Sequence, residues 1–98
     1  MSLRLRATSA AEADIAEAVD WYESQALGLA ASLIFDLDAA YARILSNPLQ
    51  FAVVHNDTRR VLLKRFPYAV IYKLVGDDVL VTACFHTSRD PASWKARI

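Results

Sequence analysis

Apolar and polar residues follow each other along the first quarter of the chain in an order that predicts one strand and one helix. Residues 3–7 alternate apolar and basic side chains, which is typical of a short strand. From Ser9 to about residue 26, apolar residues recur every three or four positions, as on the inner face of a helix. Ser9 and Glu12 have the spacing of a capping box, so we expect the helix to begin at Ser9.

A second helical pattern follows directly. Gly28 interrupts the first pattern, and apolar residues again recur at helical spacing from Ala30 to Ile44. This helix is expected to end at Asn47, because the ring of Pro48 disfavours helical geometry at the residue before it. The two helices are therefore expected to form a helical hairpin.

The second half of the chain changes to the shorter period of strands. Four runs within residues 51–85, FAVVH, RVLLK, AVIYKLV and VLVTACF, each predict a strand. Gly76 and Asp77 separate the last two runs and predict a β-hairpin. The final run, 79–85, is almost entirely apolar, which favours a strand covered on both faces.

Together these elements predict a single α+β domain over residues 1–98. Pro91 is expected at the first position of a short C-terminal helix that carries Trp94. The order is then an N-terminal strand, a helical hairpin, three to four further strands and the terminal helix. Because the strands follow the helices as a block, we expect a small, mainly antiparallel sheet with the hairpin packed on one face.

Charge is divided unevenly along the chain, although the formal net charge is zero. Residues 1–50 hold three basic and seven acidic residues, a net charge of −4. Residues 51–98 hold eight basic and four acidic residues, a net charge of +4. A basic half suits either nucleic acid or an acidic protein partner, because both exploit the same field. Charge alone does not choose between them.

Other features of the composition narrow the class of protein. Cys84 is the only cysteine, so no disulfide can form within the chain, and the first residues lack the apolar stretch of a secretory signal. No apolar run reaches the roughly 20 residues that span a bilayer. No spacing of Cys and His resembles a metal site. We expect a cytoplasmic protein without metal, cofactor or membrane partner.

Two large apolar residues fall outside the inner faces of the predicted helices. Trp21 is roughly 120° from the centre of its helix's apolar stripe, and Phe35 is nearly opposite its own stripe. Single exposed hydrophobic residues are common, so both can be ordinary flank or surface residues. The alternative is a patch that binds an amphipathic segment of another protein.

A cluster of basic residues, RRVLLKR, surrounds one of the predicted strands. Strand alternation places Arg60 and Lys64 on one face and Arg59 and Arg65 on the other. Charges on an edge strand commonly discourage pairing with other chains. The functional alternative is contact with phosphates or with an acidic partner.

Few side chains suit a catalytic site. Cys84 and His86 share one strand face, but Cys84 belongs to an apolar run, in which a thiol has a raised pKa and little reactivity. A lone His86 at the end of a strand more often holds a loop by hydrogen bonds than acts as a base. Asp36 and Asp38 diverge on a helix and form no acid/base pair. Motifs of P-loops, α/β-hydrolases and dinucleotide-binding folds are absent.

Two segments in order, RRVLLKRFPYAVIYKL at 59–74 and FHTSRDPASWKAR at 85–97, resemble the RelE/ParE toxin superfamily. Members are similar to this chain end to end, from the first strand and helical hairpin to the FPY-type turn and the closing H-x-x-R-x-P-x-x-W segment. The resemblance implies a small cytoplasmic toxin of a type II toxin-antitoxin (plasmid stabilisation) system. It also implies a cognate antitoxin that wraps the toxin, for which Trp21 and Phe35 are the candidate binding residues.

The superfamily contains two target classes. RelE-like members resemble ribosome-dependent endoribonucleases that cut messenger RNA, a reaction that needs a base, an acid and cationic stabilisation of the phosphorane. RelE-like members often place a reactive Tyr, or a Glu with a His, near the C-terminus. These acid/base residues are incomplete here, because no Tyr follows Tyr72 and no Glu follows Glu23. The residues that would have to serve in a ribonuclease are Arg60, Lys64, His86 and Arg89.

ParE-like members resemble inhibitors that bind DNA gyrase, trap it on cleaved DNA and need no catalytic group. The FPY and SRDPASW features favour this branch, so we predict a gyrase inhibitor that is not an enzyme. A degenerate, non-toxic member that only binds an antitoxin is a third alternative. The expected target-binding residues are basic or C-terminal: Arg59, Arg60, Lys64, Arg65, Arg89, Trp94 and Arg97.

Overall fold

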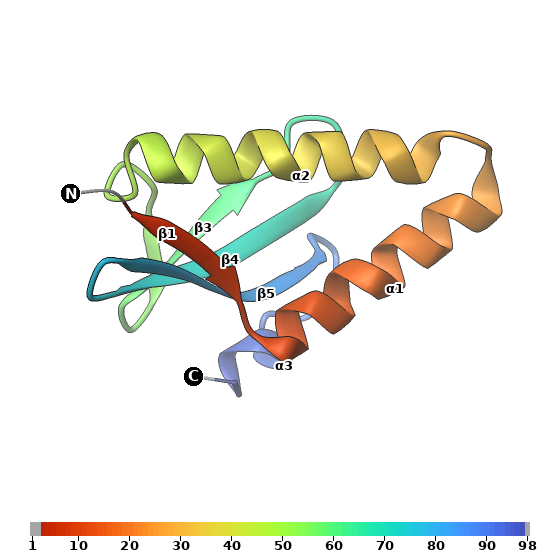
Figure 1. The fold of residues 1–98 in the computed structure, drawn as a ribbon. Helices are drawn as coiled ribbons and strands as arrows, with labels where there is room; N and C mark the ends of the chain where they lie inside the picture. Colours follow the sequence, from red (N-terminus) through yellow and green to blue (C-terminus); the bar gives the residue numbers. More distant parts are fainter. Residues whose placement is uncertain (1–2, 98) are drawn as a thin grey trace.

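The computed structural model describes residues 3–97 and shows one sheet with a helical hairpin on one face (Figure 1). The strands lie in the order β1-β5-β4-β3-β2, with β1 parallel to β5 and the other neighbours antiparallel. The predicted α+β fold and its order of elements are therefore confirmed. The elements are β1 (Arg4–Ala7), α1 (Ser9–Gln25), α2 (Leu29–Ser46), β2 (Val53–His55), β3 (Thr58–Leu62), β4 (Tyr68–Val75), β5 (Asp78–His86) and α3 (Ala92–Lys95).

The start of α1 differs from the predicted capping box. Thr8 is the N-cap, and its Oγ1 accepts a hydrogen bond from the N–H of Ala11 at 3.1 Å. The prediction that Ser9 and Glu12 form the box is therefore wrong. The N–H of Thr8 donates to the carbonyl of Val81 on β5, which holds residue 8 in the extended conformation that a cap requires. The helix begins at Ser9, as predicted, but the sheet, which local spacing does not reveal, decides which residue caps it.

The other predicted breaks in the chain agree closely with the structure. Gly28 has a φ of 89°, a conformation that favours glycine, and it turns the chain from α1 into α2. Asn47 caps the end of α2, directly before Pro48. Gly76 and residue 77 connect β4 to β5. Pro91 stands one residue before the first residue of α3 rather than at that position.

The helical hairpin and the sheet enclose the main core. Apolar side chains of both helices meet the side chains at alternate positions of β3, β4 and β5. Burying each large aliphatic side chain stabilises the fold by roughly 1.5–3 kcal/mol. The large buried side chains that the helices and the strands contribute to this core include Leu33, Leu37, Ile44, Val61, Val70, Tyr72, Val79 and Val81.

The opposite face of the sheet is covered at one end by α3. Trp94 packs there on a second cluster that includes Ile71, Ala83 and Phe85. The alternate residues of β5, such as Val81, lie in the main core. The prediction that this strand is covered on both faces is confirmed.

The outer strand β1 is shorter than β5, which leaves backbone groups of β5 without a strand partner. β1 pairs with β5 only as far as Val81. Beyond that point, the N–H of Cys84 donates to Oδ2 of Asp14 on α1 at 3.0 Å. The carbonyl of Thr82 accepts a hydrogen bond from Nη1 of Arg97 at 3.1 Å. Side chains therefore complete this edge of the sheet.

The other edge is completed in the same way by α2. β2 ends the sheet but pairs with only the start of β3. Past it, the carbonyl of Leu62 accepts a hydrogen bond from Nη2 of Arg43 at 3.2 Å. The carboxylate of Asp36 accepts hydrogen bonds from three consecutive N–H groups, those of residues 64–66, at 3.3, 2.8 and 3.0 Å. Asp36 is only 4% exposed, so its charge is offset by these amide dipoles.

Replacing Asp36 by alanine is expected to lower the free energy of unfolding by roughly 3 kcal/mol, because three N–H groups lose their acceptor. Urea denaturation followed by circular dichroism measures the change. Asp38→Ala removes an exposed carboxylate from the same helix and serves as the control, with an expected change below about 0.5 kcal/mol. Equal stability of the two variants would contradict the role assigned to Asp36.

Candidate functional site

A cleft of about 640 Å³ lies between α1 and the ends of β4 and β5. The helix contributes one wall, the two strands contribute the floor, and the segment after β5 contributes the opposite rim. The lining residues are Asp14, Glu17, Ala18, Asp20, Trp21, Tyr68, Cys84, Phe85, His86, Ser88 and Arg89.

The wall formed by α1 is acidic and ends in an exposed aromatic residue. Asp14, Glu17 and Asp20 line it together with Trp21, whose exposed fraction is 57%. Spacings of three and four residues place positions 14, 17 and 21 along one side of a helix. The sequence correctly puts Trp21 outside the core stripe, but the carboxylates beside it were overlooked. Their helical spacing relative to Trp21 is the signal that could have found them.

The floor of the cleft holds an aromatic pair, and Arg89 lines the rim. Tyr68 and His86 are directly opposite each other on β4 and β5, with ring centroids 5.3 Å apart at 77°. Burial raises the pKa of Tyr68, and Arg89 acts weakly in the opposite direction. Nδ1 of His86 accepts a hydrogen bond from the N–H of Ser88 at 3.1 Å, which favours the neutral tautomer with the proton on Nε2. His86 thus holds a loop, the role that the sequence favours for it.

The cysteine at the floor of the cleft has an unreactive thiol. Cys84 is buried, and burial raises the pKa of its thiol to about 12, with a further contribution from Asp14. A thiol is nucleophilic only as the thiolate, so this side chain acts as a small apolar group. The prediction that Cys84 packs in the core is confirmed.

The four residues proposed for a ribonuclease do not come together. Arg60 is opposite Ile71, on the sheet face that α3 partly covers. His86 is opposite Tyr68, on the face that carries the helical hairpin. Lys64 belongs to the loop that Asp36 holds. Only His86 and Arg89 line the cleft.

Three of the proposed target-binding residues make contacts within the fold. Nη1 of Arg59 donates to the carbonyls of Leu49 and Phe51, at 3.2 and 2.6 Å. Trp94 is 4% exposed and packs on Phe85, with ring centroids 5.7 Å apart. The remaining four are exposed: Arg60, Lys64, Arg65 and Arg89.

Arg97 is the third of these residues, and it forms a two-pronged ion pair with Asp14. Nη1 and Nη2 of Arg97 lie 2.7 and 2.9 Å from the two carboxylate oxygens. Hydrogen bonding to Asp14 raises the pKa of Arg97. The C-terminal segment is therefore joined to the wall of the cleft.

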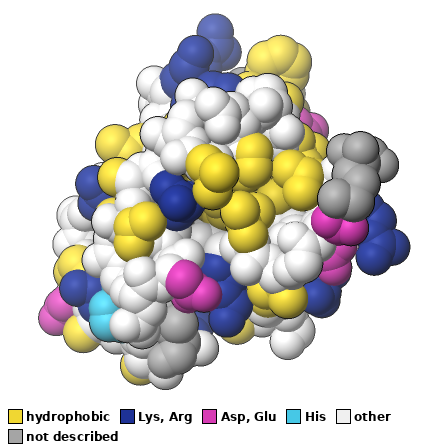
Figure 2. All heavy atoms as spheres, turned by 90° about the vertical axis from the view of Figure 1, so that its left-hand side faces the viewer, with side chains coloured by type: hydrophobic (Ala, Val, Ile, Leu, Met, Phe, Trp, Pro, Cys, Tyr) yellow, Lys and Arg dark blue, Asp and Glu magenta, His cyan; other side chains and the backbone are white. Residues whose placement is uncertain are grey.

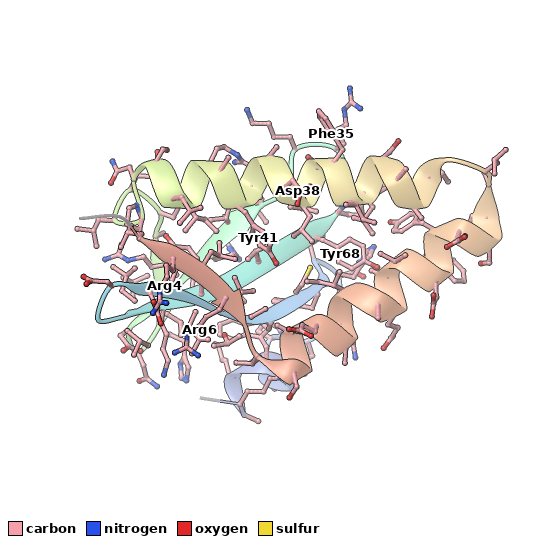
Figure 3. The ribbon with its side chains drawn as sticks, viewed as in Figure 1. Arg4, Arg6, Phe35, Asp38, Tyr41 and Tyr68 are labelled. Atoms are coloured by element: carbon pink, nitrogen blue, oxygen red, sulfur yellow. The ribbon has the colours of Figure 1, made fainter. Side chains whose placement is uncertain are left out.

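Trp21 and Phe35 lie on separate surfaces. Trp21 lines the cleft, whereas Phe35 projects from α2 on the side away from Tyr41 (Figure 3). Phe35 is 71% exposed and is absent from the lining of the cleft. The two residues therefore do not form one patch, although the sequence groups them together.

Apolar side chains also gather at the end of the molecule shown in Figure 2. Leu45 near the end of α2, Leu49 in the loop that follows and Val53 in β2 are exposed hydrophobic residues. The cleft is built from other elements, so this apolar end is not part of it. The sequence does not predict this surface.

The described residues, 3–97, contain no group of three or more His, Cys, Asp or Glu side chains arranged to hold a metal ion. Within the same residues, no helix is both long and apolar enough to cross a membrane.

The family model described as "ParE toxin of type II toxin-antitoxin system, parDE" matches residues 5–91. The chain belongs to the ParE toxin family. The predicted superfamily and its ParE-like branch are thereby confirmed. No curated protein matches this ParE-family chain.

Two solved structures have the same fold as this ParE-family chain. The structure titled "Chromosomal ParDE TA system from P. aeruginosa" is similar with a TM-score of 0.73 and 19% identity, over 87% of this chain and 96% of that one. The RelBE2 toxin-antitoxin complex from Mycobacterium tuberculosis is similar with a TM-score of 0.57 and 15% identity, over 88% of this chain and 99% of that one. At sequence identities of 19% and 15%, the similarity to these structures shows a shared fold and nothing more.

The buried thiol gives a direct test of the cleft floor. With a pKa of about 12, roughly one Cys84 thiol in ten thousand is ionised at pH 8. We therefore expect iodoacetamide to leave Cys84 unmodified in the folded protein and to alkylate it fully in urea, as measured by mass spectrometry. Cys84→Ser provides the blank. Rapid alkylation of the folded protein would show that the thiol is open to solvent and more acidic than this structure allows.

Proposed function

We propose that this toxin acts by binding DNA gyrase rather than by catalysis, as part of a plasmid stabilisation system in the cytoplasm. The observation that carries the proposal is the charge of the cleft. Asp14 is neutralised by Arg97, but the exposed Glu17 and Asp20 remain on the wall of the cleft that holds His86. Such a wall repels the phosphates of messenger RNA, so it opposes ribonuclease chemistry. Membership of the ParE family supports the same choice.

The exposed cations are the proposed contact residues for gyrase, and they lie on more than one face of the protein. Arg60, Lys64, Arg65 and Arg89 are free to meet acidic groups of a partner protein. Trp94 and Arg97 support Arg89 indirectly, because they fix the segment that follows it against the sheet and α1. Arg59 has a similar role, since it holds the loop that precedes β2.

A ribosome-dependent endoribonuclease is the second candidate, and one observation favours it. Tyr68, His86 and Arg89 line the same cleft, and a phenol beside an imidazole and a guanidinium could in principle move protons and stabilise a phosphorane. However, the pKa of Tyr68 is raised by burial, which makes its phenol a poor base at neutral pH. Nδ1 of His86 is also occupied by Ser88.

The cognate antitoxin is the proposed occupant of the cleft. The two similar solved structures are titled as toxin-antitoxin assemblies, which supports a partner of this kind. Trp21 and Tyr68 offer an apolar anchoring site within a concave surface. Glu17 and Asp20 at the wall favour a segment that combines an apolar anchor with a basic side chain.

Purified protein is expected to inhibit DNA supercoiling by gyrase and to leave ribosome-bound messenger RNA intact. Both activities can be measured in parallel on one preparation. Cleavage of the messenger RNA without any effect on supercoiling would overturn the gyrase proposal in favour of the ribonuclease.

Expression without an antitoxin should arrest growth, and normal growth would instead identify a non-toxic member that only binds its antitoxin.

Trp21→Ala is expected to weaken antitoxin binding by about tenfold or more, because an exposed indole in a cleft is a typical binding hot spot. Isothermal titration calorimetry with the cognate antitoxin measures the affinity. Leu27→Ala changes a fully exposed residue in the turn between the helices and should leave it unchanged. Inhibition of gyrase should survive both substitutions. Equal antitoxin affinity of the two variants would remove the cleft as the binding site.

A further inference from the structure

Phe35 and the loop between β3 and β4 form one continuous surface beside α2. Asp36, the next residue of the helix, accepts hydrogen bonds from the N–H groups of residues 64–66, which brings this loop against α2. Figure 1 shows the loop rising beside the helix, and Figure 3 shows Phe35 projecting outward at the same part of α2. We call this the Phe35 surface, and it comprises Phe35, Lys64 and Arg65.

The Phe35 surface is held in one conformation before any partner binds. Three hydrogen bonds to the buried Asp36 fix the loop backbone, and the ring of Phe66 packs on Tyr22 with centroids 4.9 Å apart. The N–H of Leu63 also donates to the carbonyl of Tyr68 at 2.9 Å. A partner would therefore lose little affinity to ordering of this backbone.

Two cations lie beside an exposed aromatic side chain on this surface. Lys64 and Arg65 are exposed, and Phe35 is 71% exposed. The Asp36 carboxylate beneath the loop is buried and occupied by backbone N–H groups. The surface therefore presents positive charge beside one apolar anchor point.

We propose that the Phe35 surface docks an acidic segment of the target protein that carries an apolar or aromatic side chain. Phe35 then belongs to the target-binding surface and not, with Trp21, to the antitoxin-binding one. This inference rests on the proposed function, in which the chain acts by binding a protein target. Charge complementarity selects the acidic residues of the segment, and Phe35 selects its apolar residue.

A protein segment fits this surface better than nucleic acid does. Proteins that bind phosphate backbones carry a strongly basic face, whereas this chain has a net charge of zero and the Phe35 surface carries two cations. Exposed Phe and Arg, by contrast, are enriched at the centre of protein interfaces.

Two variants test the proposal. Phe35→Ala removes the apolar anchor, and the double variant Lys64→Glu, Arg65→Glu reverses the charge. Each should weaken binding to immobilised gyrase by about tenfold or more and reduce growth arrest in cells without antitoxin. Affinity for the antitoxin should stay unchanged, the opposite of the result for Trp21→Ala.

Matched controls separate this effect from general damage. Leu27→Ala removes an exposed apolar side chain elsewhere on the hairpin, and Arg4→Glu reverses a largely exposed cation at the other edge of the sheet. Both should bind gyrase and arrest growth like the unchanged protein. Urea denaturation confirms that every variant is folded at the assay temperature.

The outcomes distinguish failure of this inference from failure of the proposed function. If the unchanged protein arrests growth without inhibiting gyrase, the gyrase proposal fails, but loss of arrest in Phe35→Ala still supports a target-docking surface. Full growth arrest by the folded Phe35→Ala and double variants would overturn the inference. Loss of antitoxin affinity with intact growth arrest would assign Phe35 to the antitoxin. Binding of a DNA probe that the double variant loses would show a nucleic-acid surface instead.

Discussion

The two outer strands of the sheet are too short to pair with every backbone N–H and carbonyl group of their neighbouring strands. The rest of the structure depends on the side chains that bind these groups instead. Each buried backbone group left without a partner costs about 1–3 kcal/mol. Asp14 and Arg97 complete β5 past the end of β1, Arg43 completes β3 past the end of β2, and Asp36 binds the N–H groups of the loop that follows β3. Three of these four side chains come from the helical hairpin, so its position on the sheet is set by directional hydrogen bonds as well as by apolar packing.

The same contacts place the two surfaces to which we assign binding. Asp14 joins α1 and the C-terminal segment to β5, and it lines the cleft that holds Trp21. Asp36 fixes the loop that carries the cations of the Phe35 surface. The uneven charge of the two halves of the sequence thus becomes a division in space, with carboxylates of α1 at the cleft and cations of the loop on the outer side of α2.

Most of the fold could be predicted from the sequence because its signals are local. Gly28, Pro48 and Gly76 mark breaks through their own backbone preferences, and the apolar period identifies each element between them. The site was less predictable, because its contacts link distant residues: Arg97 meets Asp14 across 83 positions, a pairing that no spacing rule reveals. Residue type alone also suggested surface roles for side chains such as Arg59, which the fold uses internally.

The proposed division of charge explains how a small toxin with no net charge can recognise two partners. On these assignments the cleft selects a basic, apolar-anchored segment, and the Phe35 surface selects an acidic one. A single surface of one charge would distinguish the two partners less well. Long-range attraction depends on the sum of the charges, whereas discrimination between partners depends on where the charges lie. Keeping Asp36 buried beneath the cations is part of this arrangement, since its carboxylate organises the loop while its lone pairs are directed at backbone N–H groups.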